Sequence, residues 1–291
     1  MSHRAGFVNI VGSPNVGKST LMNQMVGEKL SIVTSKAQTT RHRIHGIVNG
    51  EDYQVVYSDT PGVVNAAYKL HEAMMSYVES SFKDADILLF ITDIYESEMN
   101  HVATLERVKK LNIPVICLVN KVDLGSQQQV EARIQYWKEK LPNAEVIAVS
   151  ALHGFGKDWV WQRILELLPE NPPYFDKEDM SDRPMRFFVA EMVREKIFLR
   201  CEKEVPYSCQ VEVEEYIVEE NLIRIRAIII VERDSQKGII IGKGGSMLKL
   251  IGREARKDIE AFVGKKVFLE TFVKVDKDWR ASEHKLKKYG Y

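Results

Sequence analysis

The sequence predicts an α/β domain with a mostly parallel sheet, followed by a smaller α+β domain. In the first 168 residues, short apolar runs alternate with amphipathic stretches, which is the pattern of strands and helices in a parallel sheet. A proline-rich stretch that begins at Pro169 and an acidic segment at 176–182 then interrupt this pattern and indicate a linker. Two later runs alternate apolar and charged residues, as antiparallel strands with one wet face do. We therefore expect a first domain at 1–170, a linker at 171–182 and a second domain at 183–291.

Each expected element follows from hydrophobic periodicity. The strands of the first domain are expected at 7–11, 54–58, 87–92, 115–120 and 146–149. Its helices are expected at 18–26, 70–82, 102–110, 130–140 and 159–168. The second domain is expected to run helix, strand, strand, glycine-rich turn, helix and strand, at 185–198, 209–218, 222–231, 242–245, 246–262 and 266–275. A short basic helix is expected within the last residues, 279–291.

Composition restricts the class of protein without naming a partner. The chain has 291 residues, is 45% hydrophobic and 28% charged, and carries 41 Lys+Arg against 41 Asp+Glu. Such values are typical of a globular protein with two domains, and the balanced charge neither supports nor excludes a polyanion. The three cysteines lack metal-ligand spacing and are expected to be buried and unpaired. The first apolar run is too short for a signal peptide or a membrane span, so a cytoplasmic location is expected.

A phosphate-binding loop is predicted between the first strand and the first helix. Residues 12–19 read Gly-Ser-Pro-Asn-Val-Gly-Lys-Ser, with glycines, lysine and hydroxyl at the required spacing. Glycines let backbone N–H groups point inward, and the helix N-terminus adds partial positive charge for a β-phosphate. Lys18 would reach the β- and γ-phosphates, and the Ser19 hydroxyl would ligate Mg²⁺. The residues expected to contact the nucleotide here are Gly12, Ser13, Pro14, Asn15, Val16, Gly17, Lys18, Ser19 and Thr20.

Three further segments follow strand runs in the order that a guanine-nucleotide site requires. Residues 59–62 supply a carboxylate for the metal and an N–H for the γ-phosphate. Residues 120–123 end in a carboxylate that can accept two N–H bonds from guanine, which adenine cannot offer, and a backbone N–H at 150–152 can donate to guanine O6. Each segment alone is commonplace, but together they lie where open α/β sheets bind ligands. The residues concerned are Asp59, Thr60, Pro61, Gly62, Asn120, Lys121, Asp123, Ser150, Ala151 and Leu152.

Motif by motif, the first 170 residues resemble the translation-factor-related GTPases. Within that group, residues 36–43, Lys-Ala-Gln-Thr-Thr-Arg-His-Arg, resemble the first switch of the Era family. The resemblance implies that Thr40 joins Ser19 and Asp59 around Mg²⁺. It also makes Lys18, Thr40, Asp59 and Gly62 the residues of catalysis. Val63 stands where Ras-type proteins carry the glutamine that orients water. Relatives with an asparagine like Asn15 and a Thr-Thr pair are similar to potassium-activated GTPases, so Asn15 and Thr39 are candidate K⁺ ligands.

The second domain resembles a type II KH domain in its expected element order. Gly242 to Gly245 form a Gly-x-x-Gly turn, which in KH domains presses against single-stranded RNA because side chains would hold the phosphates away. An apolar edge of Ile239, Ile240, Ile241 and Leu248 could receive unstacked bases or simply pack the sheet. The residues expected to contact RNA are Lys237, Ile241, Gly242, Lys243, Gly244, Gly245, Lys249, Arg253 and Arg256, with Lys257 beside them.

The charge of the second domain is polarised along the chain. Residues 236–291 hold 14 Lys+Arg against 7 Asp+Glu, whereas residues 175–235 hold 10 against 15. A basic surface around the turn would supply the salt-dependent attraction that RNA binding needs. A solvated helix face explains any single one of these charges equally well.

The Era resemblance implies a GTPase that uses GTP/GDP and Mg²⁺, with K⁺ as a further candidate, and that binds single-stranded rRNA near the 3′ end of the small-subunit rRNA. Its partner would be the small ribosomal subunit, whose assembly it would assist, with the nucleotide state switching RNA binding. A monomer is expected, and weak peripheral membrane association stays open. Two alternatives remain at this point: a second domain that binds protein or membrane, and an RNA-binding adaptor that holds GTP without hydrolysing it.

Overall fold

The structure is a computed structural model that describes residues 3–96 and 102–291. Met1 and Ser2, which the expected first domain includes, lie outside the described residues. The described chain forms two compact units. The first contains the residues up to Ser31, Thr40–Ala66 and His71–Asp182, and the second contains Ile32–Thr39, Ala67–Leu70 and Arg183–Tyr291. Two short segments from the first part of the sequence thus belong to the second unit.

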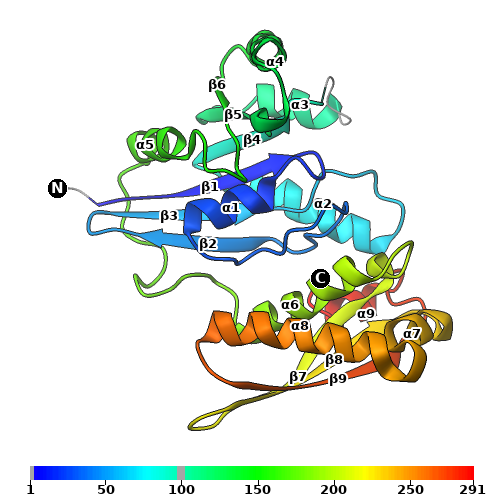
Figure 1. Ribbon diagram of the computed structural model, residues 1–291. Helices are drawn as coiled ribbons and strands as arrows, with labels where there is room; N and C mark the ends of the chain where they lie inside the picture. The colour runs from blue at the N-terminus through cyan, green and yellow to red at the C-terminus, as the bar shows by residue number, and fades with distance from the viewer. Residues whose placement is uncertain (1–2, 97–101) are drawn as a thin grey trace. The chain divides into compact units, whose positions relative to one another are not determined.

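The first unit is a six-stranded sheet with helices on both faces (Figure 1). Its strands are β1 (Arg4–Gly12), β2 (Ile44–Asn49), β3 (Tyr53–Asp59), β4 (Ile87–Asp93), β5 (Val115–Asn120) and β6 (Glu145–Ala148). Its helices are α1 (Lys18–Val26), α2 (Lys69–Ser81), α3 (Val102–Lys109), α4 (Gln127–Lys140) and α5 (Lys157–Leu167). The strand order is β2-β3-β1-β4-β5-β6, and all neighbours are parallel except β2 and β3. The expected α/β fold with a mostly parallel sheet is confirmed.

A buried apolar cluster joins one face of this sheet to its helices. Phe90 of β4 and Cys117 of β5 pack with Phe82 and with Trp137 of α4. The rings of Phe90 and Trp137 meet edge to face with centroids 5.3 Å apart. Such burial removes a large apolar area from water, so it fixes the central strands, and with them the loops that follow their ends.

Strand β2 is an edge strand that the sequence analysis did not anticipate. It pairs antiparallel with β3, from Ile44 opposite Asp59 to Asn49 opposite Gln54. Its six residues include a histidine, a glycine and an asparagine, so they lack the apolar run that marked the other strands. Pairing with β3, rather than local composition, therefore determines this strand.

The chain after α5 runs along β2 and β3 and is not detached from the first unit. Gln54 is fully buried, and its Oε1 accepts from the N–H groups of Tyr174 and Phe175 at 2.7 and 3.0 Å. Its Nε2 donates to the carbonyl of Phe175 at 2.9 Å. The N–H of Ile47 donates to the carbonyl of Met180 at 2.9 Å. The acidic side chains of this segment stay largely exposed, while its backbone covers the free edge of β2.

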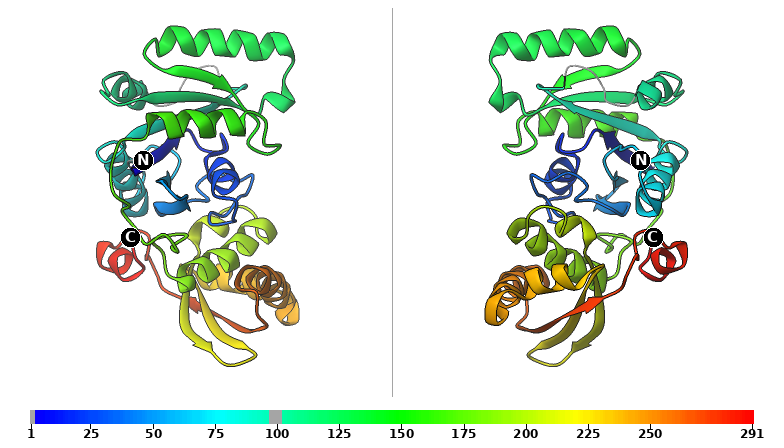
Figure 2. Two further views of the ribbon diagram at one scale, coloured as in Figure 1. Left: turned by 90° about the vertical axis from the view of Figure 1, so that its left-hand side faces the viewer. Right: turned by 90° about the vertical axis from the view of Figure 1, so that its right-hand side faces the viewer.

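The second unit is a three-stranded sheet with two long helices on one face (Figure 2). Its strands are β7 (Gln210–Val218), β8 (Ile223–Val231) and β9 (Val267–Val275), in the order β7-β8-β9. Its helices are α6 (Met185–Arg200), α7 (Asp234–Ile241), α8 (Ser246–Val263) and α9 (Glu283–Lys288). Strands β7 and β8 are antiparallel, as expected, and β8 and β9 are parallel.

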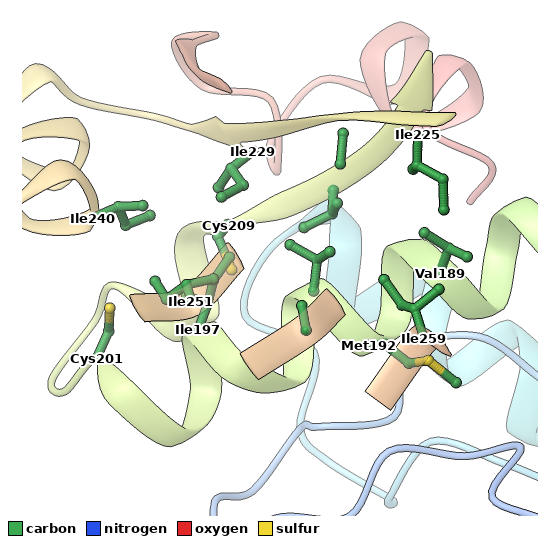
Figure 3. Packing of buried hydrophobic residues seen from close by; sticks show 14 of the residues in the cluster. Val189, Met192, Ile197, Cys201, Cys209, Ile225, Ile229, Ile240, Ile251 and Ile259 are labelled. Atoms are coloured by element: carbon green, nitrogen blue, oxygen red, sulfur yellow. The ribbon is translucent and has the colours of Figure 1, made fainter. Parts of the chain in front are cut away.

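The core of this unit lies between α6, α8 and the sheet (Figure 3). Ile197 of α6, Ile229 of β8 and Ile251 of α8 are fully buried in one cluster. Ile240 belongs to the same cluster. Residues 239–241, expected as part of an apolar edge beside the turn, end α7, and no helix was expected there. Ile240 therefore packs the core, whereas Ile239 is about half exposed.

The final basic segment is shorter as a helix than expected. Only Glu283–Lys288 is helical, within the expected 279–291. Trp279 is fully buried, and its Nε1 donates to the carbonyl of Ser208 at 3.0 Å. The segment therefore packs against its own unit. No helix among the described residues is long and apolar enough to cross a membrane. All three cysteines are buried, and none of them is in a disulfide bond.

Residues 32–39 lie against α6 within the second unit. The N–H of Val33 donates to Glu195 Oε1 at 3.3 Å, and Lys36 Nζ donates to the carbonyls of Phe198 and Cys201 at 2.5 Å each. Arg194 Nη2 donates to the carbonyl of Thr39 at 2.6 Å. The ammonium group of Lys36 thus satisfies carbonyls at the C-terminal end of α6, where a positive charge is favoured.

Candidate functional site

The predicted nucleotide residues gather at one edge of the first sheet. Strands β1, β3, β4 and β5 are parallel neighbours in the sheet, so their carboxyl ends meet there. β1 ends at Gly12, β3 at Asp59 and β5 at Asn120. Ser150 follows the end of β6. The structure therefore brings together the predicted residues of the phosphate loop, the Asp59 segment and the two base-reading segments.

The phosphate loop has a conformation that requires its particular residues. Gly17 has φ 104° and Asn15 has φ 62°, and the left-handed region accepts glycine and asparagine more readily than other residues. A Cβ atom on Gly12 would lie 2.1 Å from the carbonyl oxygen of Ile91. A Cβ atom on Gly17 would lie 2.2 Å from the side chain of Asn120. Close packing against β4 and β5 therefore excludes side chains at both glycines.

Lys18 begins α1 and is buried inside this loop. Its Nζ donates to the carbonyls of Gly12 and Ser13 at 3.1 and 2.7 Å. Burial lowers the pKa of Lys18 from 10.5 to about 8, although the charges of Asp59 and Glu96 oppose this shift. An ammonium group held in this way is a ready partner for an anion, because a phosphate would replace two carbonyls with a full negative charge.

Ser19, Thr40 and Asp59 converge as the sequence predicted for a metal. Ser19 Oγ donates to Asp59 Oδ2 at 2.6 Å, and the hydroxyls of Ser19 and Thr40 lie 2.9 Å apart. Burial raises the pKa of Asp59. Its other oxygen, Oδ1, is buried and accepts no hydrogen bond from the residues that the structure describes. A buried carboxylate oxygen beside two hydroxyls fits Mg²⁺, which prefers hard oxygen ligands.

The segment after Asp59 is fixed to the phosphate loop. Thr60 Oγ1 donates to the carbonyl of Ile10 at 2.7 Å, and the N–H of Val63 donates to the carbonyl of Gly12 at 3.3 Å. A Cβ atom on Gly62 would lie 2.8 Å from Cα of Pro14. Because Gly62 has no side chain, its backbone can lie directly against Pro14 of the phosphate loop.

Asn120 connects the phosphate loop to the segments that would read the base. Its Nδ2 donates to the carbonyl of Val16 at 2.7 Å, and its Oδ1 accepts from the N–H of Ala151 at 2.9 Å. Lys121 has φ 60°, and its Nζ donates to Asp93 Oδ2 at 2.7 Å. The buried amide of Asn120 thus connects its own segment to the phosphate loop and to the Ala151 segment.

Asp123 presents its carboxylate beside the last of these segments. Its Oδ1 accepts from Ser150 Oγ at 2.5 Å. His153 Nε2 lies 3.6 Å from its Oδ2, and the side chain of His153 is 61% exposed. Leu152 is largely exposed. The Asp123 carboxylate is therefore positioned by a hydroxyl on one side and is accessible for a base on the other.

The sequence analysis missed the residues of the turn that follows β4 and missed His153. Asp93 and Glu96 contact Lys121 and Ser13 respectively. No motif contains them, and their only signal in the sequence is the carboxyl end of a strand that neighbours the phosphate-loop strand. His153 could have been found only from its closeness in sequence to Ser150.

The glycine-rich turn of the second unit exposes bare backbone. Gly242, Gly244 and Gly245 have φ 71°, 61° and 80°. A Cβ atom on Gly244 or Gly245 would meet nothing within 4 Å, so the surface there is open to a ligand. Gly242 is tightly packed, because its Cβ atom would lie 2.8 Å from Met247. Helix α8 begins directly after the turn and adds the partial positive charge of its N-terminus.

The predicted basic residues lie on the surface of this unit. Lys243 belongs to the turn, and Lys249, Arg253 and Arg256 lie on α8 at spacings of four and three residues. These spacings place the three side chains on one side of the helix. All four residues are exposed, while Lys237 and Ile241 are only partly exposed. The structure therefore places a row of positive charges beside the bare turn.

Comparison with known proteins supports both parts of the chain. A family model described as a 50S ribosome-binding GTPase matches residues 7–121, and a KH-domain model matches residues 204–280. GTPase Era of Geotalea uraniireducens is 44% identical over 290 residues, which cover 99% of this chain and 98% of that protein. GTPase Era of Staphylococcus haemolyticus is 40% identical over 291 residues, 99% of this chain and 97% of that protein.

Two solved structures match along the whole chain. One is Era in complex with MgGDPNP and nucleotides 1506–1542 of 16S ribosomal RNA, with a TM-score of 0.94, 38% identity and 99% of both chains covered. The other is a variant of Era from Aquifex aeolicus bound to GDP and AlF4⁻, with the same TM-score, identity and coverage. The GTPase and KH folds predicted from the sequence are confirmed. Identity at this level over nearly the full length of these relatives shows that the chain belongs to the Era family of GTPases, enzymes that hydrolyse GTP.

Proposed function

We propose that this GTPase binds single-stranded ribosomal RNA near the 3′ end of the small-subunit rRNA, assists assembly of the small ribosomal subunit, and switches its RNA binding with its nucleotide state. The observation that carries this proposal is the pairing of a phosphate-loop site with a bare Gly-x-x-Gly turn in one chain. A related Era structure contains MgGDPNP and a 3′ fragment of 16S rRNA together, which supports assigning one ligand to each site.

At the nucleotide site, each group has a role that its geometry supports. Lys18 would exchange its carbonyl partners for the β- and γ-phosphates, and the backbone N–H groups of residues 12–20 would surround the phosphates. Ser19, Thr40 and Asp59 would hold Mg²⁺, directly or through its water. When bound, Mg²⁺ would supply positive charge that offsets the negative charge developing on the phosphates.

The base would be read by groups on two loops. The Asp123 carboxylate would accept two N–H bonds from guanine, and a backbone N–H of residues 150–152 would donate to guanine O6. Asn120 acts indirectly, because its amide holds the phosphate loop and the Ala151 segment together. Lys121, fixed by Asp93, offers its methylene stem as a flat apolar support for the purine.

Hydrolysis would be slow without a partner. Val63, a buried apolar residue, takes the place of a water-orienting glutamine. Asn15 and Thr39 are the proposed K⁺ ligands, and Gly62 would donate its N–H to the γ-phosphate. Turnover measured in KCl and in NaCl at equal ionic strength tests the K⁺ assignment. We expect faster turnover in KCl, and equal rates would remove K⁺ from the mechanism.

The coupling between the two activities has a covalent basis in the first switch. Residues 32–39 belong to the second unit through their bonds to α6, and Thr40, the next residue, contacts Ser19 and Asp59 of the first unit. A nucleotide that changes the position of Thr40 would therefore also move residues 32–39, which are bonded to α6. A ligand with different affinity for the two arrangements would shift their populations, and RNA binding would shift with them.

At the RNA site, residues 242–245 would lie against the RNA backbone while the exposed cations of α8 attract phosphates. The test compares two glycines that flank α8, both in the left-handed region with open space around them. Gly244→Asp places a carboxylate in the turn, and Gly264→Asp places one at the opposite end of α8. Filter binding with a pyrimidine-containing single-stranded RNA should show at least tenfold weaker binding for Gly244→Asp alone. Equal binding by both variants would remove the RNA assignment.

The cellular target needs a separate experiment. Crosslinking in cells followed by RNA sequencing should recover fragments from the 3′ end of the small-subunit rRNA. Recovery should depend on Gly244 and not on Gly264. Fragments spread evenly over large-subunit rRNA would contradict the proposed partner.

A further inference from the structure

The turn between β4 and α3 supplies a carboxylate that reaches the phosphate loop. Asp93 ends β4, and its Oδ1 accepts from the N–H groups of Tyr95 and Glu96 at 2.9 and 3.0 Å, which folds residues 93–96 into a tight turn. The side chain of Glu96 then bridges two hydroxyls. Ser13 Oγ donates to its Oε1, and Thr92 Oγ1 donates to its Oε2 at 2.8 Å.

Both hydroxyl partners of Glu96 are buried. Thr92 is fully buried in β4, and Ser13 is 3% exposed. β1 and β4 are parallel neighbours, with Gly12 opposite Ile91. Glu96 therefore ties the first side chain of the phosphate loop to the strand beside it. On its other flank the loop is tied by Thr60 and Val63 of the segment after β3.

We propose that Glu96 is a positioning residue of the nucleotide site, which holds Ser13 and the start of the phosphate loop in the arrangement that binds phosphate. Ser13 matters because its carbonyl accepts from Lys18 Nζ at 2.7 Å. A loop free to move at Ser13 would also release the lysine that the phosphates need. This inference rests on the assignment of nucleotide binding to the loop around Lys18.

The positioning role acts on binding rather than on the chemical step. Ordering a loose loop costs free energy whenever a nucleotide enters, and the cost is the same for GTP and GDP because both fill the β-phosphate position. Loss of the contact should therefore raise the dissociation constants of both nucleotides and the KM for GTP, while kcat at saturation changes little. A residue that stabilised only the transition state would show the opposite division.

The experiment uses the full chain with fluorescent GDP and GTP analogues and steady-state hydrolysis. Glu96→Ala should weaken both nucleotides about tenfold, in keeping with the loss of hydrogen bonds to a charged group, and should change kcat less than about twofold. Glu96→Gln keeps two polar atoms for the hydroxyls and should restore affinity to within about threefold of the natural protein. Glu139→Ala, on the exposed side of α4, removes a carboxylate elsewhere and serves as the control.

A double-mutant cycle with Ser13 shows whether the contact itself is responsible. Ser13→Ala should weaken binding about as much as Glu96→Ala, and the double variant should lose about tenfold rather than about a hundredfold, since either change breaks the same contact. Ser13→Ala removes one oxygen atom, so it tests the contact by itself if Glu96→Ala does not fold, and unchanged nucleotide affinity of Ser13→Ala would then overturn the proposal. Losses of nucleotide affinity that are additive in the double variant would overturn the proposal. It would also be overturned if Glu96→Ala bound nucleotide as tightly as the natural protein, or if Glu96→Gln bound it as weakly as Glu96→Ala.

Lys18→Met separates failure of this inference from failure of the nucleotide-site assignment. If Lys18→Met binds no nucleotide and Glu96→Ala binds normally, the site assignment stands and the role of Glu96 is wrong. If Lys18→Met binds GDP as well as the natural protein, the loop is not the phosphate site, and the role proposed for Glu96 falls with it.

Discussion

Lys18→Met is expected to stabilise the nucleotide-free protein while it abolishes nucleotide binding. The lysine is fully buried, and its pKa falls from 10.5 to about 8 because burial disfavours the charged form more than Asp59 and Glu96 favour it. Methionine has a similar length and carries no charge. The substitution therefore removes a group whose charged form is less stable in the folded protein than in water.

The size of the effect follows from the two pKa values. They differ by about 2.5, and each pKa unit corresponds to about 1.4 kcal/mol. Below pH 8 the lysine is charged in both states, and the folded state is penalised by about 3 kcal/mol. Between pH 8 and 10.5 only the unfolded chain carries the proton, so the stability of the natural protein rises with pH by up to about 1.4 kcal/mol per unit. Above pH 10.5 the penalty has disappeared.

The assay is urea unfolding of the nucleotide-free full chain at several pH values, for the natural protein and for Lys18→Met. Tryptophan fluorescence reports mainly on the first unit, because Trp137, Trp159 and Trp161 lie there, whereas Trp279 lies in the second unit. Groups that do not interact with Lys18 titrate equally in both proteins, so their contributions cancel in the difference. Asp59 is the exception, because burial raises its pKa and the charge of Lys18 lowers it. The variant should be more stable by about 3 kcal/mol at pH 7 and by little at pH 10.5. A difference that does not change with pH would refute the reasoning, and so would a variant that is less stable throughout.

Two other substitutions test contacts within the first unit. Arg43→Ala should lower the free energy of unfolding by about 2 kcal/mol, because the buried guanidinium donates to Asp84 at 2.6 and 2.9 Å. Arg163→Ala, which breaks exposed pairs, should lower it by much less. Burial raises the pKa of Asp84, but the hydrogen bonds from Arg43 outweigh this effect and leave the pKa lowered. The difference in the free energy of unfolding between the natural protein and Arg43→Ala should therefore shrink as the pH falls below 3.8. A difference that stays constant would contradict this role of the Arg43–Asp84 pair. Gln54→Leu should release the segment after α5, because three bonds to 174–175 are lost. In limited proteolysis, that segment should be cleaved faster than in the natural protein, while the rest of the chain is cleaved at the same rate. If the segment is cleaved no faster, Gln54 does not hold it.

The parts of the fold that were predictable are those specified by local sequence. The central strands are continuous apolar runs, and the phosphate loop is a contiguous motif whose residues act through their own backbone. The expected helix at 18–26 coincides with α1 (Lys18–Val26), because the loop before it and the glycine after it mark both ends. Local signals were sufficient wherever structure and function depend on neighbours in sequence.

The missed parts depend on contacts between distant residues. β2 is a strand because β3 lies beside it. The three isoleucines of α7 have the β-branched character of a strand, but Ile240 is drawn into a core made by α6, α8 and the sheet. Glu96 belongs to the site only because β4 lies beside β1. No periodicity or motif records such adjacency, so the sequence alone could not name these residues.

The most direct test of the account is the base preference of Asp123→Asn. In the proposed assignment the carboxylate of Asp123 accepts from guanine N1 and N2, whereas an asparagine amide would donate to the carbonyl that xanthine carries at C2. We predict that the variant loses GDP binding by a hundredfold or more, in keeping with the cost of unpaired buried polar groups, and binds XDP instead. Retained preference for GDP, with XDP still rejected, would contradict the claim that this site selects guanine through Asp123.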